Sequence, residues 1–448
     1  MTRPLRKILV ANRGAIARRV IRACTSLGIP SVAVYSEADA GAPYLDEASE
    51  ALPLQGVTAA DTYLNVPALL DCLERSGADA LHPGYGFLSE RADFARAVAA
   101  AGAVFIGPAA RFLDLMGDKV NGRTRMAEAG FPVLPGSGRL ADAAAALQAA
   151  EQIGYPLMLK PAAGGGGIGM YRVDDAAELH RVFGRASRLA AAAFDDAGLF
   201  LEQAVERPRH VEIQVLGDGR GRAVHLYERE CSLQRRHQKV IEEAPAPGLD
   251  RRAMDELAEQ AAAAVATMGY DSIGTVEMLR RDDGVFGFIE MNTRIQVEHG
   301  VSEAVTGLDL VAAQIRLAAG GALPERVPLD GFAIEARVYA EDPYSGYAST
   351  GTLAHFRVPE MHQVRVDTGY AAGQSVTPYY DPLLAKVIAG GRTREQAIGR
   401  LLVGLKGLEV RGVATNIPLL QAVLEDEDFL AGNIDTGFLG RRRWLSAR

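Results

Sequence analysis

Cysteine is scarce in this chain of 448 residues, and long apolar runs are absent. The three cysteines, Cys24, Cys72 and Cys231, lie far apart and form no CxxC pair, which argues against a disulfide framework or a zinc site and favours a reducing compartment. The basic N-terminal segment has an apolar run only at residues 8–11, and no stretch of about 18 apolar residues follows it. We therefore expect no signal peptide, no membrane-spanning helix and a cytoplasmic location.

Positively charged residues are also fewer than negatively charged ones. The chain has 48 Lys and Arg against 56 Asp and Glu, a formal charge of −8, and its isoelectric point is near 5.6. This balance argues against non-specific nucleic-acid binding and leaves room only for a local basic pocket, so we expect neither a nucleic-acid nor a membrane partner. Apolar residues make up 48% and charged residues 23%, as in globular proteins. Because a single core stops growing at about 250–300 residues, we expect two or three domains.

The first third of the sequence alternates between strand-like and helix-like patterns. Three apolar runs have the composition of strands, and three segments have helical spacing: residues 7–11, 31–35 and 103–106, and residues 15–27, 66–75 and 92–101. This alternation predicts a parallel sheet covered by helices. The first turn contains one glycine, Gly14, where a dinucleotide fingerprint needs three. NAD and FAD are therefore disfavoured.

We expect an α/β protein of three domains: residues 1–115, residues 116–322 and residues 331–446. The first is the Rossmann-like unit, and the second contains an inserted subdomain at about residues 131–203. A polar, proline-containing stretch at residues 323–331 has the composition of a linker. After it, β-like runs at residues 333–340, 363–367 and 384–388 precede two helical segments, which predicts an α+β unit.

A glycine-rich loop follows an apolar strand at residues 155–170. Lys160 ends the strand, and four glycines at residues 164–167 come next, with Gly169 after Ile168. Consecutive glycines let backbone N–H groups wrap an anion, and the lysine places a charge beside it. No GK[ST] follows, so this is not a Walker A loop. We favour phosphate binding over the alternative, a flexible surface turn.

Within residues 228–240, four potentially cationic side chains crowd into residues 235–239: Arg235, Arg236, His237 and Lys239. Cations placed together repel one another unless an anion or an acidic partner neutralises them. An anionic ligand is therefore favoured over a solvated charge run. Cys231 lies in the same stretch, but nothing beside it predicts an activated thiolate, so we interpret it as structural.

An alternating polar pattern occupies residues 288–299. In an extended chain, period two places five polar residues on one face: Glu290, Asn292, Arg294, Gln296 and Glu298. A strand-like run at residues 275–278 supplies a further carboxylate, Glu277. Carboxylate and amide oxygens are the ligands that Mg²⁺ prefers, and Mg²⁺ commonly links such residues to substrate phosphates. The pattern favours a magnesium–nucleotide site over a solvated sheet face.

Eight motifs occur in order along nearly the whole chain: ANRG (11–14), HPGYGFLSE (82–90), MGDK (116–119), GGGGIGM (164–170), PRHVEIQVLGDG (208–219), ERECSLQRRHQKVIEEAPAP (228–247), EMNTRIQVEH (290–299) and YYDPLLAKV (379–387). Together they resemble the biotin carboxylase component of biotin-dependent carboxylases, a member of the ATP-grasp superfamily. The resemblance implies an ATP-grasp fold for residues 116–322, with a mobile glycine-rich lid at about residues 131–203. Residues 1–115 and 331–446 would be the N-terminal and C-terminal biotin carboxylase domains.

The resemblance implies a reaction that uses ATP, bicarbonate and two Mg²⁺ (or Mn²⁺) ions to carboxylate biotin held on a carrier protein. The ATP-binding residues would be Lys119, Lys160, Gly164, Gly165, Gly166, Gly167, Gly169, Glu202, His210, Gln234 and His237. Among them, Glu202 would meet the adenine and ribose end. The metal ligands would be Glu277, Glu290 and Asn292.

The same resemblance assigns roles around bicarbonate. Lys239, Arg294, Gln296 and the backbone of Val297 would surround it. Glu298 would be the general base, giving a carboxyphosphate intermediate. Arg337 would stabilise the biotin enolate, although from the residues alone an ordinary strand arginine is the favoured interpretation. The catalytic set is thus Glu298, Arg337, Arg294 and Lys239, and a closing lid would protect carboxyphosphate from water.

Five positions depart from the family pattern. Ile168 lies where the loop commonly has a cation, Pro161 where alanine is usual, and Gln203 where lysine is usual. Ala15 and Gly300 replace a common glutamate and proline. None of these positions carries chemistry, so we expect effects on ATP affinity, adenine contact and lid closure.

The resemblance implies partners as well. A biotin carboxyl carrier protein and carboxyltransferase subunits would act in trans, because no Met-Lys-Met biotinylation motif is present, and family members are commonly homodimers. The choice of acyl acceptor would belong to the carboxyltransferase. Two alternatives stay open: another ATP-grasp ligase that makes an acyl phosphate, or a catalytically impaired ATP-binding homologue.

Overall fold

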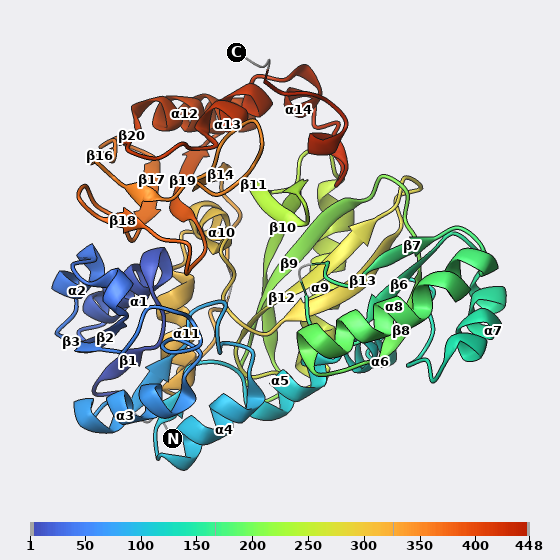
Figure 1. The fold of residues 1–448 in the computed structure, drawn as a ribbon, viewed down its shortest axis with the longest axis horizontal. Coiled ribbons are helices and arrows are strands. Elements are labelled where there is room, and N and C mark those ends of the chain that lie inside the picture. Colours follow the sequence, from blue (N-terminus) through green and yellow to red (C-terminus); the bar gives the residue numbers. More distant parts are fainter. Residues whose placement is uncertain (1–3, 166, 326, 446–448) are drawn as a thin grey trace.

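The computed structural model describes residues 4–165, 167–325 and 327–445. In Figure 1 a parallel sheet lies at the lower left, a small sheet beside α7 and α8 at the right, and the C-terminal helices at the top, with a large sheet between them. Within the described ranges, no helix is both long enough and apolar enough to cross a membrane.

The N-terminal sheet is parallel and has the strand order β3-β2-β1-β4-β5. Its strands are β1 (Ile8–Val10), β2 (Ser31–Tyr35), β3 (Glu50–Pro53), β4 (Ala80–His82) and β5 (Val104–Phe105). The connections contain η1 (Glu37–Asp39) and the helices α1 (Gly14–Ser26), α2 (Pro43–Glu47), α3 (Val66–Ser76) and α4 (Ala92–Ala100). Parallel neighbours need such crossovers. The predicted parallel sheet with helices is therefore confirmed.

A small antiparallel sheet of order β7-β6-β8 carries the glycine-rich loop between two of its strands. This region comprises α5 (Ala110–Gly117), α6 (Lys119–Glu128), α7 (Ala143–Ile153), β6 (Leu157–Pro161), β7 (Tyr171–Val173), α8 (Ala176–Phe194) and β8 (Leu199–Gln203). Side chains of Asp118, Asp142 and Asp175 cap the first turns of α6, α7 and α8. Such caps satisfy backbone N–H groups that a helix start leaves free. The cap at Asp118 also fixes Lys119 as the first residue of α6.

The large sheet is antiparallel throughout, in the order β13-β12-β9-β10-β11-β14-β19-β17. Its strands are β9 (Arg209–Gly217), β10 (Ala223–Arg235), β11 (Gln238–Ala244), β12 (Ile273–Arg280), β13 (Phe286–Asn292), β14 (Phe332–Tyr339), β17 (Val364–Thr368) and β19 (Leu383–Gly391). Because β14 pairs with β11, the sheet continues across the stretch predicted as a linker. The predicted domain bounds stay a prediction.

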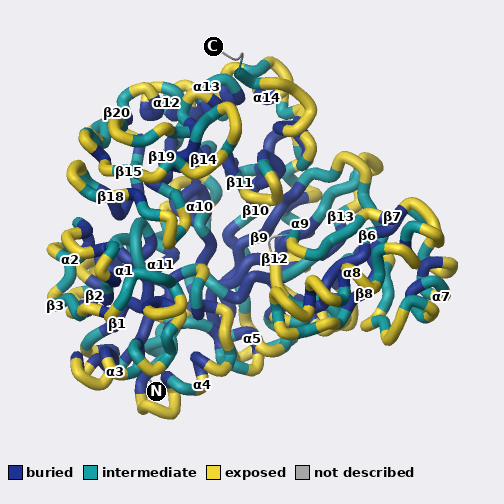
Figure 2. The backbone as a smooth tube through the Cα atoms, viewed as in Figure 1, coloured by how far each residue is buried: buried dark blue, intermediate teal, exposed yellow. Residues whose placement is uncertain are grey.

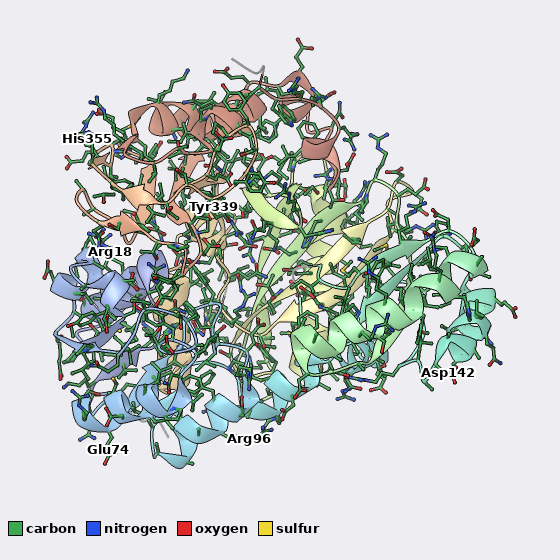
Figure 3. The ribbon with its side chains drawn as sticks, viewed as in Figure 1. Arg18, Glu74, Arg96, Asp142, Tyr339 and His355 are labelled. Carbon is green, nitrogen blue, oxygen red and sulfur yellow. The ribbon has the colours of Figure 1, made fainter. Side chains whose placement is uncertain are left out.

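Helices and short strand pairs complete the molecule. They are α9 (Arg251–Thr267), α10 (His299–Thr306), α11 (Leu310–Ala318), α12 (Arg394–Gly407), α13 (Ile417–Leu424), α14 (Glu427–Leu430) and η2 (Phe438–Gly440), with β15 (Gly351–Thr352) on β18 (Ser375–Val376) and β16 (His355–Arg357) on β20 (Glu409–Arg411). Figure 2 shows the central strands as the most buried part of the chain. In Figure 3 the exposed Asp142 and Arg96 lie at the outer rim, whereas the buried Tyr339 lies inside.

Candidate active site

A cleft of about 630 Å³ has walls from both the small sheet and the large sheet. Nearly all the predicted site residues line it: Lys119, Lys160, Gly165, Gly167, Glu202, His210, Gln234, His237, Lys239, Glu277, Glu290, Asn292, Arg294, Gln296, Val297, Glu298 and Arg337. Gly164 and Gly169 belong to the same loop but do not line the cleft. Gly166 lies outside the described residues. Segments almost 220 residues apart in the chain are thus brought to one place.

Two lysines enter the cleft from the small-sheet side, each paired with a glutamate. Lys160, at the end of β6, forms an ion pair with Glu202 of the neighbouring β8, and Lys119 of α6 forms one with Glu290. Burial and the nearby charge of Lys160 lower the pKa of Lys119 to about 8. An anionic ligand that entered the cleft would replace these glutamates as the partner of each ammonium group, because its oxygens accept the same charge-assisted hydrogen bonds.

The glycine-rich loop runs close to its neighbours. Gly164, Gly167 and Gly169 have φ values of 81°, 75° and 74°, in the left-handed region that favours glycine. A Cβ at Gly167 would lie 2.6 Å from Cδ2 of His237, and one at Gly164 would overlap the ring of Phe194. Glycine is therefore required here by both backbone conformation and space.

The departures from the family pattern lie around this loop. Ile168 is half exposed, and Pro161 is the buried last residue of β6. Gln203, at the end of β8, lines the cleft, and its Oε1 accepts a hydrogen bond of 3.0 Å from Nη1 of Arg281. The side chain that replaces lysine is thus fixed by a neighbouring arginine.

His210 lies between Gln234 and the carboxylates of the cleft. Nε2 of Gln234 lies 3.0 Å from Nδ1 of His210 and, as an amide N–H, donates to it. The imidazole proton is then assigned to Nε2, which lies 2.9 Å from Oε2 of Glu277. The histidine therefore has a defined tautomer and orientation.

The predicted metal ligands lie on two neighbouring strands. Glu277 of β12 and Glu290 of β13 are directly paired across the sheet, and Nδ2 of Asn292 donates to Oε1 of Glu277 at 2.8 Å. Burial would raise the pKa of Glu277, but Lys239 and His210 hold it well below its usual range. His210, Glu212 and Glu277 also bring ligand atoms within 4.8 Å of one another. Ionised carboxylates with an amide oxygen fit a hard cation such as Mg²⁺.

The predicted extended run is confirmed only as far as Asn292, where β13 ends. The alternation predicted beyond it is wrong, because the chain leaves the sheet and turns into α10 at His299. Glu90, from the turn after β4, holds this turn: it accepts bonds of 3.1 Å from N of Thr293 and 3.0 Å from Nε of Arg294. Arg294, Gln296 and Glu298 still line the cleft, so they are neighbours through the turn.

Lys239 lies at the centre of the cleft's charges. Its Nζ contacts Glu212 at 2.5 Å, Glu298 at 2.6 Å and Glu277 at 3.0 Å. Burial would lower its pKa, but these carboxylates raise it well above the usual range. The cluster of cations in residues 228–240 is therefore neutralised partly by the protein itself, and Arg235 likewise pairs with Glu341.

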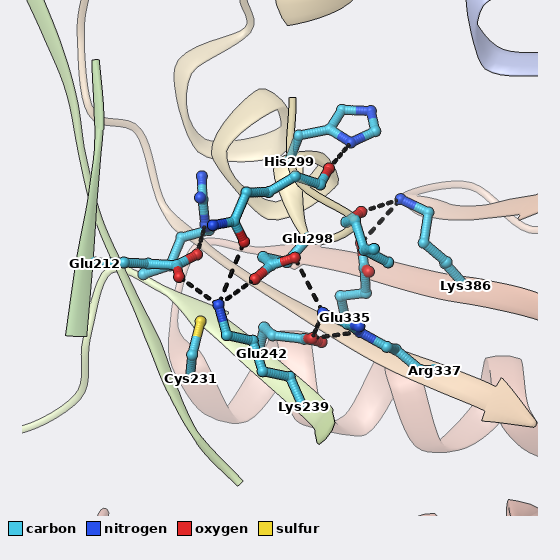
Figure 4. A network of polar contacts seen from close by, with 12 residues as sticks. Glu212, Cys231, Lys239, Glu242, Glu298, His299, Glu335, Arg337 and Lys386 are labelled. Carbon is cyan, nitrogen blue, oxygen red and sulfur yellow. Dashed lines mark hydrogen bonds and ion pairs between the residues drawn. The ribbon is translucent and has the colours of Figure 1, made fainter. Parts of the chain in front are cut away.

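Glu298 is held between two cations. Its Oε1 contacts Nζ of Lys239 at 2.6 Å, and its Oε2 accepts a bond of 3.0 Å from Nη2 of Arg337 (Figure 4). Although burial favours the neutral form, these two cations hold the pKa of Glu298 well below its usual range. The side chain is therefore ionised and has a fixed orientation.

Sequence reasoning missed the carboxylates behind these cations. Glu212 holds Lys239, Glu242 accepts a bond of 2.6 Å from Nε of Arg337, and Glu90 holds Arg294. Asp381 also lines the cleft, and burial raises its pKa. All four lie inside the quoted motifs, and the alternation of polar and apolar residues in HVEIQV was the available signal for Glu212.

Comparisons with known proteins agree with this geometry. Three family descriptions match successive parts of the chain: biotin carboxylase N-terminal domain at residues 4–113, carbamoyl-phosphate synthase L chain ATP binding domain at residues 118–326, and biotin carboxylase C-terminal domain at residues 335–441. A biotin carboxylase of Halalkalibacterium halodurans is 46% identical over 97% of each chain.

Two solved structures have the same fold. A biotin carboxylase–beta-gamma-ATP complex from Campylobacter jejuni has a TM-score of 0.96 and 41% identity, covering 98% of this chain and 99% of that one. The biotin carboxylase domain dimer of the Hydrogenobacter thermophilus 2-oxoglutarate carboxylase, with MgADP and bicarbonate, has a TM-score of 0.95 and 43% identity, covering 99% of each. With the ATP-grasp fold confirmed and the cleft in place, the chain belongs to the biotin carboxylase family.

Proposed function

We propose that this protein is the ATP-dependent ligase that carboxylates biotin on a biotin carboxyl carrier protein. The observation that carries the proposal is the arrangement of Lys239, Glu298 and Arg337 beside a set of oxygen ligands for a cation. The relative from Campylobacter jejuni was solved with a nucleotide, and that from Hydrogenobacter thermophilus with MgADP and bicarbonate. The same ligands suit this cleft.

Nucleotide binding would use the cations of the cleft walls. Lys119, Lys160 and His210 would hold the phosphates with the glycine-rich loop, Glu202 would face the adenine and ribose end, and Gln234 and His237 would add further contacts. Glu277, Glu290 and Asn292 would hold two Mg²⁺ (or Mn²⁺) ions. Bound ions supply neutralisation of phosphate charge, the main requirement of phosphoryl transfer.

Bicarbonate would lie against Lys239, Arg294, Gln296 and the backbone of Val297. The carboxylate of Glu298 takes the bicarbonate proton, and the freed oxygen attacks the γ-phosphorus as the bond to ADP breaks. A ligand on Lys239 would also weaken its hold on Glu298, which raises the pKa of that carboxylate toward a value better suited to a base.

The carboxyphosphate formed would then fragment to CO₂ and phosphate. Phosphate removes the N1′ proton of biotin, and the resulting enolate attacks CO₂ to give carboxybiotin. Arg337, whose Nη2 already bonds Glu298, would stabilise the enolate oxygen. A fixed donor of this kind contributes roughly 3–4 kcal/mol to transition-state stabilisation.

Partners and location complete the proposal. A carrier protein supplies biotin, and carboxyltransferase subunits take the carboxyl group to an acyl acceptor of their own choice. A homodimer is supported by the dimeric relative. Free, buried Cys24, Cys72 and Cys231 support a cytoplasmic setting.

The deciding experiment measures ATP cleavage by the purified chain with and without bicarbonate and free biotin. We expect cleavage that requires bicarbonate and is stimulated by biotin. Cleavage without bicarbonate dependence would instead indicate another ATP-grasp ligase that makes an acyl phosphate. ATP binding without cleavage would indicate a catalytically impaired homologue.

A further inference from the structure

Two buried carboxylates lie under Arg337 and have no role in the steps above. Glu242 of β11 and Glu335 of β14 are directly opposite each other across the antiparallel pair, and both are fully buried. Side chains in such positions begin about 4.5–5.5 Å apart, and like charges directly opposite destabilise the pairing. Two ionised carboxylates at this place would therefore repel strongly.

Each carboxylate has one bonded oxygen and one oxygen without a partner. Oε1 of Glu242 accepts from Nε of Arg337 at 2.6 Å, and Oε2 of Glu335 lies 3.5 Å from Nζ of Lys386. Within the described residues, Oε2 of Glu242 and Oε1 of Glu335 have no hydrogen-bond partner. Buried acceptors left unpaired are costly. One proton shared between these two free oxygens would satisfy both, with the O–H of one carboxyl donating to the other.

The charges around the pair lead to the same requirement. Three carboxylates, Glu242, Glu298 and Glu335, share two nearby cations, Arg337 and Lys386 (Figure 4). The other charged groups near the pair belong to the same network: Lys239 contacts Glu212 and Glu277 as well as Glu298, Arg229 contacts Glu212, and Asp367 contacts both Arg365 and Lys386. Counted with these groups, six carboxylates share five cations. One added proton balances the buried cluster, whereas an unbalanced buried charge is strongly disfavoured.

We propose that Glu242 and Glu335 share one proton and thereby act as positioning residues for Arg337. The shared proton leaves one negative charge under the guanidinium, which anchors its Nε edge. The charge of Arg337 is then free to act on Glu298 and on the substrate oxygen. The proposal rests on the proposed function for the role of Arg337, but not for the proton itself.

Loss of the proton has a defined consequence. Burial raises the pKa of Glu242 to about 8 and that of Glu335 to about 7, against the lowering effect of Arg337 and Lys386. When the O–H bond breaks and the proton leaves to solvent, the pair gains a second negative charge. That charge offsets the positive charge of Arg337 and weakens its stabilisation of the enolate oxygen.

The test uses Glu242→Gln and Glu335→Gln, which keep the side-chain shape and replace the shared proton by a fixed amide N–H. At neutral pH we expect the biotin kcat/KM of each to stay within about threefold of wild type. The biotin kcat/KM of wild type should fall about tenfold per pH unit once the pair has lost its proton. The kcat/KM of both variants should not change over the same pH range. Glu243→Gln is the matched control: Glu243 is buried on the same strand, faces the other side and pairs with Arg394, so this variant should follow wild type.

A second measurement does not depend on activity. Infrared spectra of wild type and Glu243→Gln should contain a protonated-carboxyl band that disappears as pH rises through the range of about 7–8. The band should be absent from Glu242→Gln and from Glu335→Gln, so either variant suffices if the other does not fold. The proposal would be overturned by an identical infrared band in wild type and both variants. It would also be overturned if both variants kept the fall of kcat/KM at high pH. Absence of bicarbonate-dependent ATP cleavage in wild type would instead overturn the proposed function and leave the infrared result standing.

Discussion

Lys239 is the residue on which the charge balance of the cleft depends. Its ammonium contacts carboxylates from three separate elements, Glu212 on β9, Glu277 on β12 and Glu298 before α10. Each of these carboxylates would be costly to bury alone. The lysine therefore stabilises the cleft and presents the cation that we propose binds bicarbonate.

Glu298→Gln tests the base. The amide keeps the side-chain shape but cannot take a proton from bicarbonate, so turnover should fall by roughly 10²–10⁴-fold. Nucleotide affinity should change little, because Glu298 does not contact the proposed ATP-binding residues. Steady-state ATP cleavage and ATP titration measure the two quantities. Glu228→Gln, a buried carboxylate paired with Arg251 outside the cleft, is the control, and unchanged turnover in Glu298→Gln would remove the base from its role.

His82 makes a prediction about acid stability. Burial holds its pKa at about 3, against an ordinary value of 6.5, and Nδ1 accepts a bond of 3.0 Å from N of Gly84. Between those two values the unfolded chain binds a proton that the folded chain does not, so the free energy of unfolding falls as pH falls. The slope from this residue is up to about 1.4 kcal/mol per pH unit.

His82→Asn keeps an acceptor for Gly84 and removes the titration. Its unfolding temperature should fall less steeply than that of wild type as the pH is lowered from about 6.5 toward 4. The exposed His362→Asn is the control and should keep the wild-type slope. Parallel slopes for His82→Asn and wild type would contradict the prediction.

The glycine-rich loop is an element whose conformation only glycine permits. Gly167→Ala adds a Cβ against His237 at a left-handed backbone position. We expect the ATP KM to rise by roughly 5–30-fold, the equivalent of about 1–2 kcal/mol. Gly165→Ala, which adds a Cβ to open space in the same loop, should have a much smaller effect. An equal rise of the ATP KM in both variants would mean that the close approach of Gly167 to His237 is not the cause.

The hairpin between β10 and β11 stores strain at its tip. Arg235 pairs with Gln238, so Arg236 and His237 form a two-residue turn, with φ values of 52° and 64°. Such turns favour Asn and Gly, because other residues are strained there. Arg236→Asn should therefore raise stability by about 1 kcal/mol, measured by denaturant unfolding. A loss of stability would show that contacts of the Arg236 side chain outweigh the strain.

Element boundaries in the first third of the chain were largely predictable from local pattern. The strand predicted at residues 31–35 is β2, and the helices predicted at residues 66–75 and 92–101 are α3 and α4 within one residue. The alternating run failed beyond Asn292, because period two reports which side chains share a face and not whether the backbone stays in a sheet. The turn held by Glu90 keeps the same residues together without strand geometry.

At the scale of the whole molecule, the N-terminal unit contributes directly to the cleft. Glu90 bonds both Thr293 and Arg294 from a segment some 200 residues earlier. Glu90→Ala should raise the bicarbonate KM by roughly 10–100-fold, since a charge-assisted hydrogen bond contributes about 1.5–3 kcal/mol, while the ATP KM changes little. Glu74→Ala on the exposed face of α3 is the control. A rise in both KM values would indicate general distortion instead.

The sequence by itself determined the kinds of elements, the glycine loop and the chemical identity of the site residues, because apolar period and residue type are local properties. Tertiary structure decided which charges face each other. The pairing of β11 with β14 sets Glu242 against Glu335, and the packing of two strands and the turn before α10 brings three carboxylates to Lys239. Such contacts depend on register between strands far apart in the chain, and side-chain period alone does not fix that register.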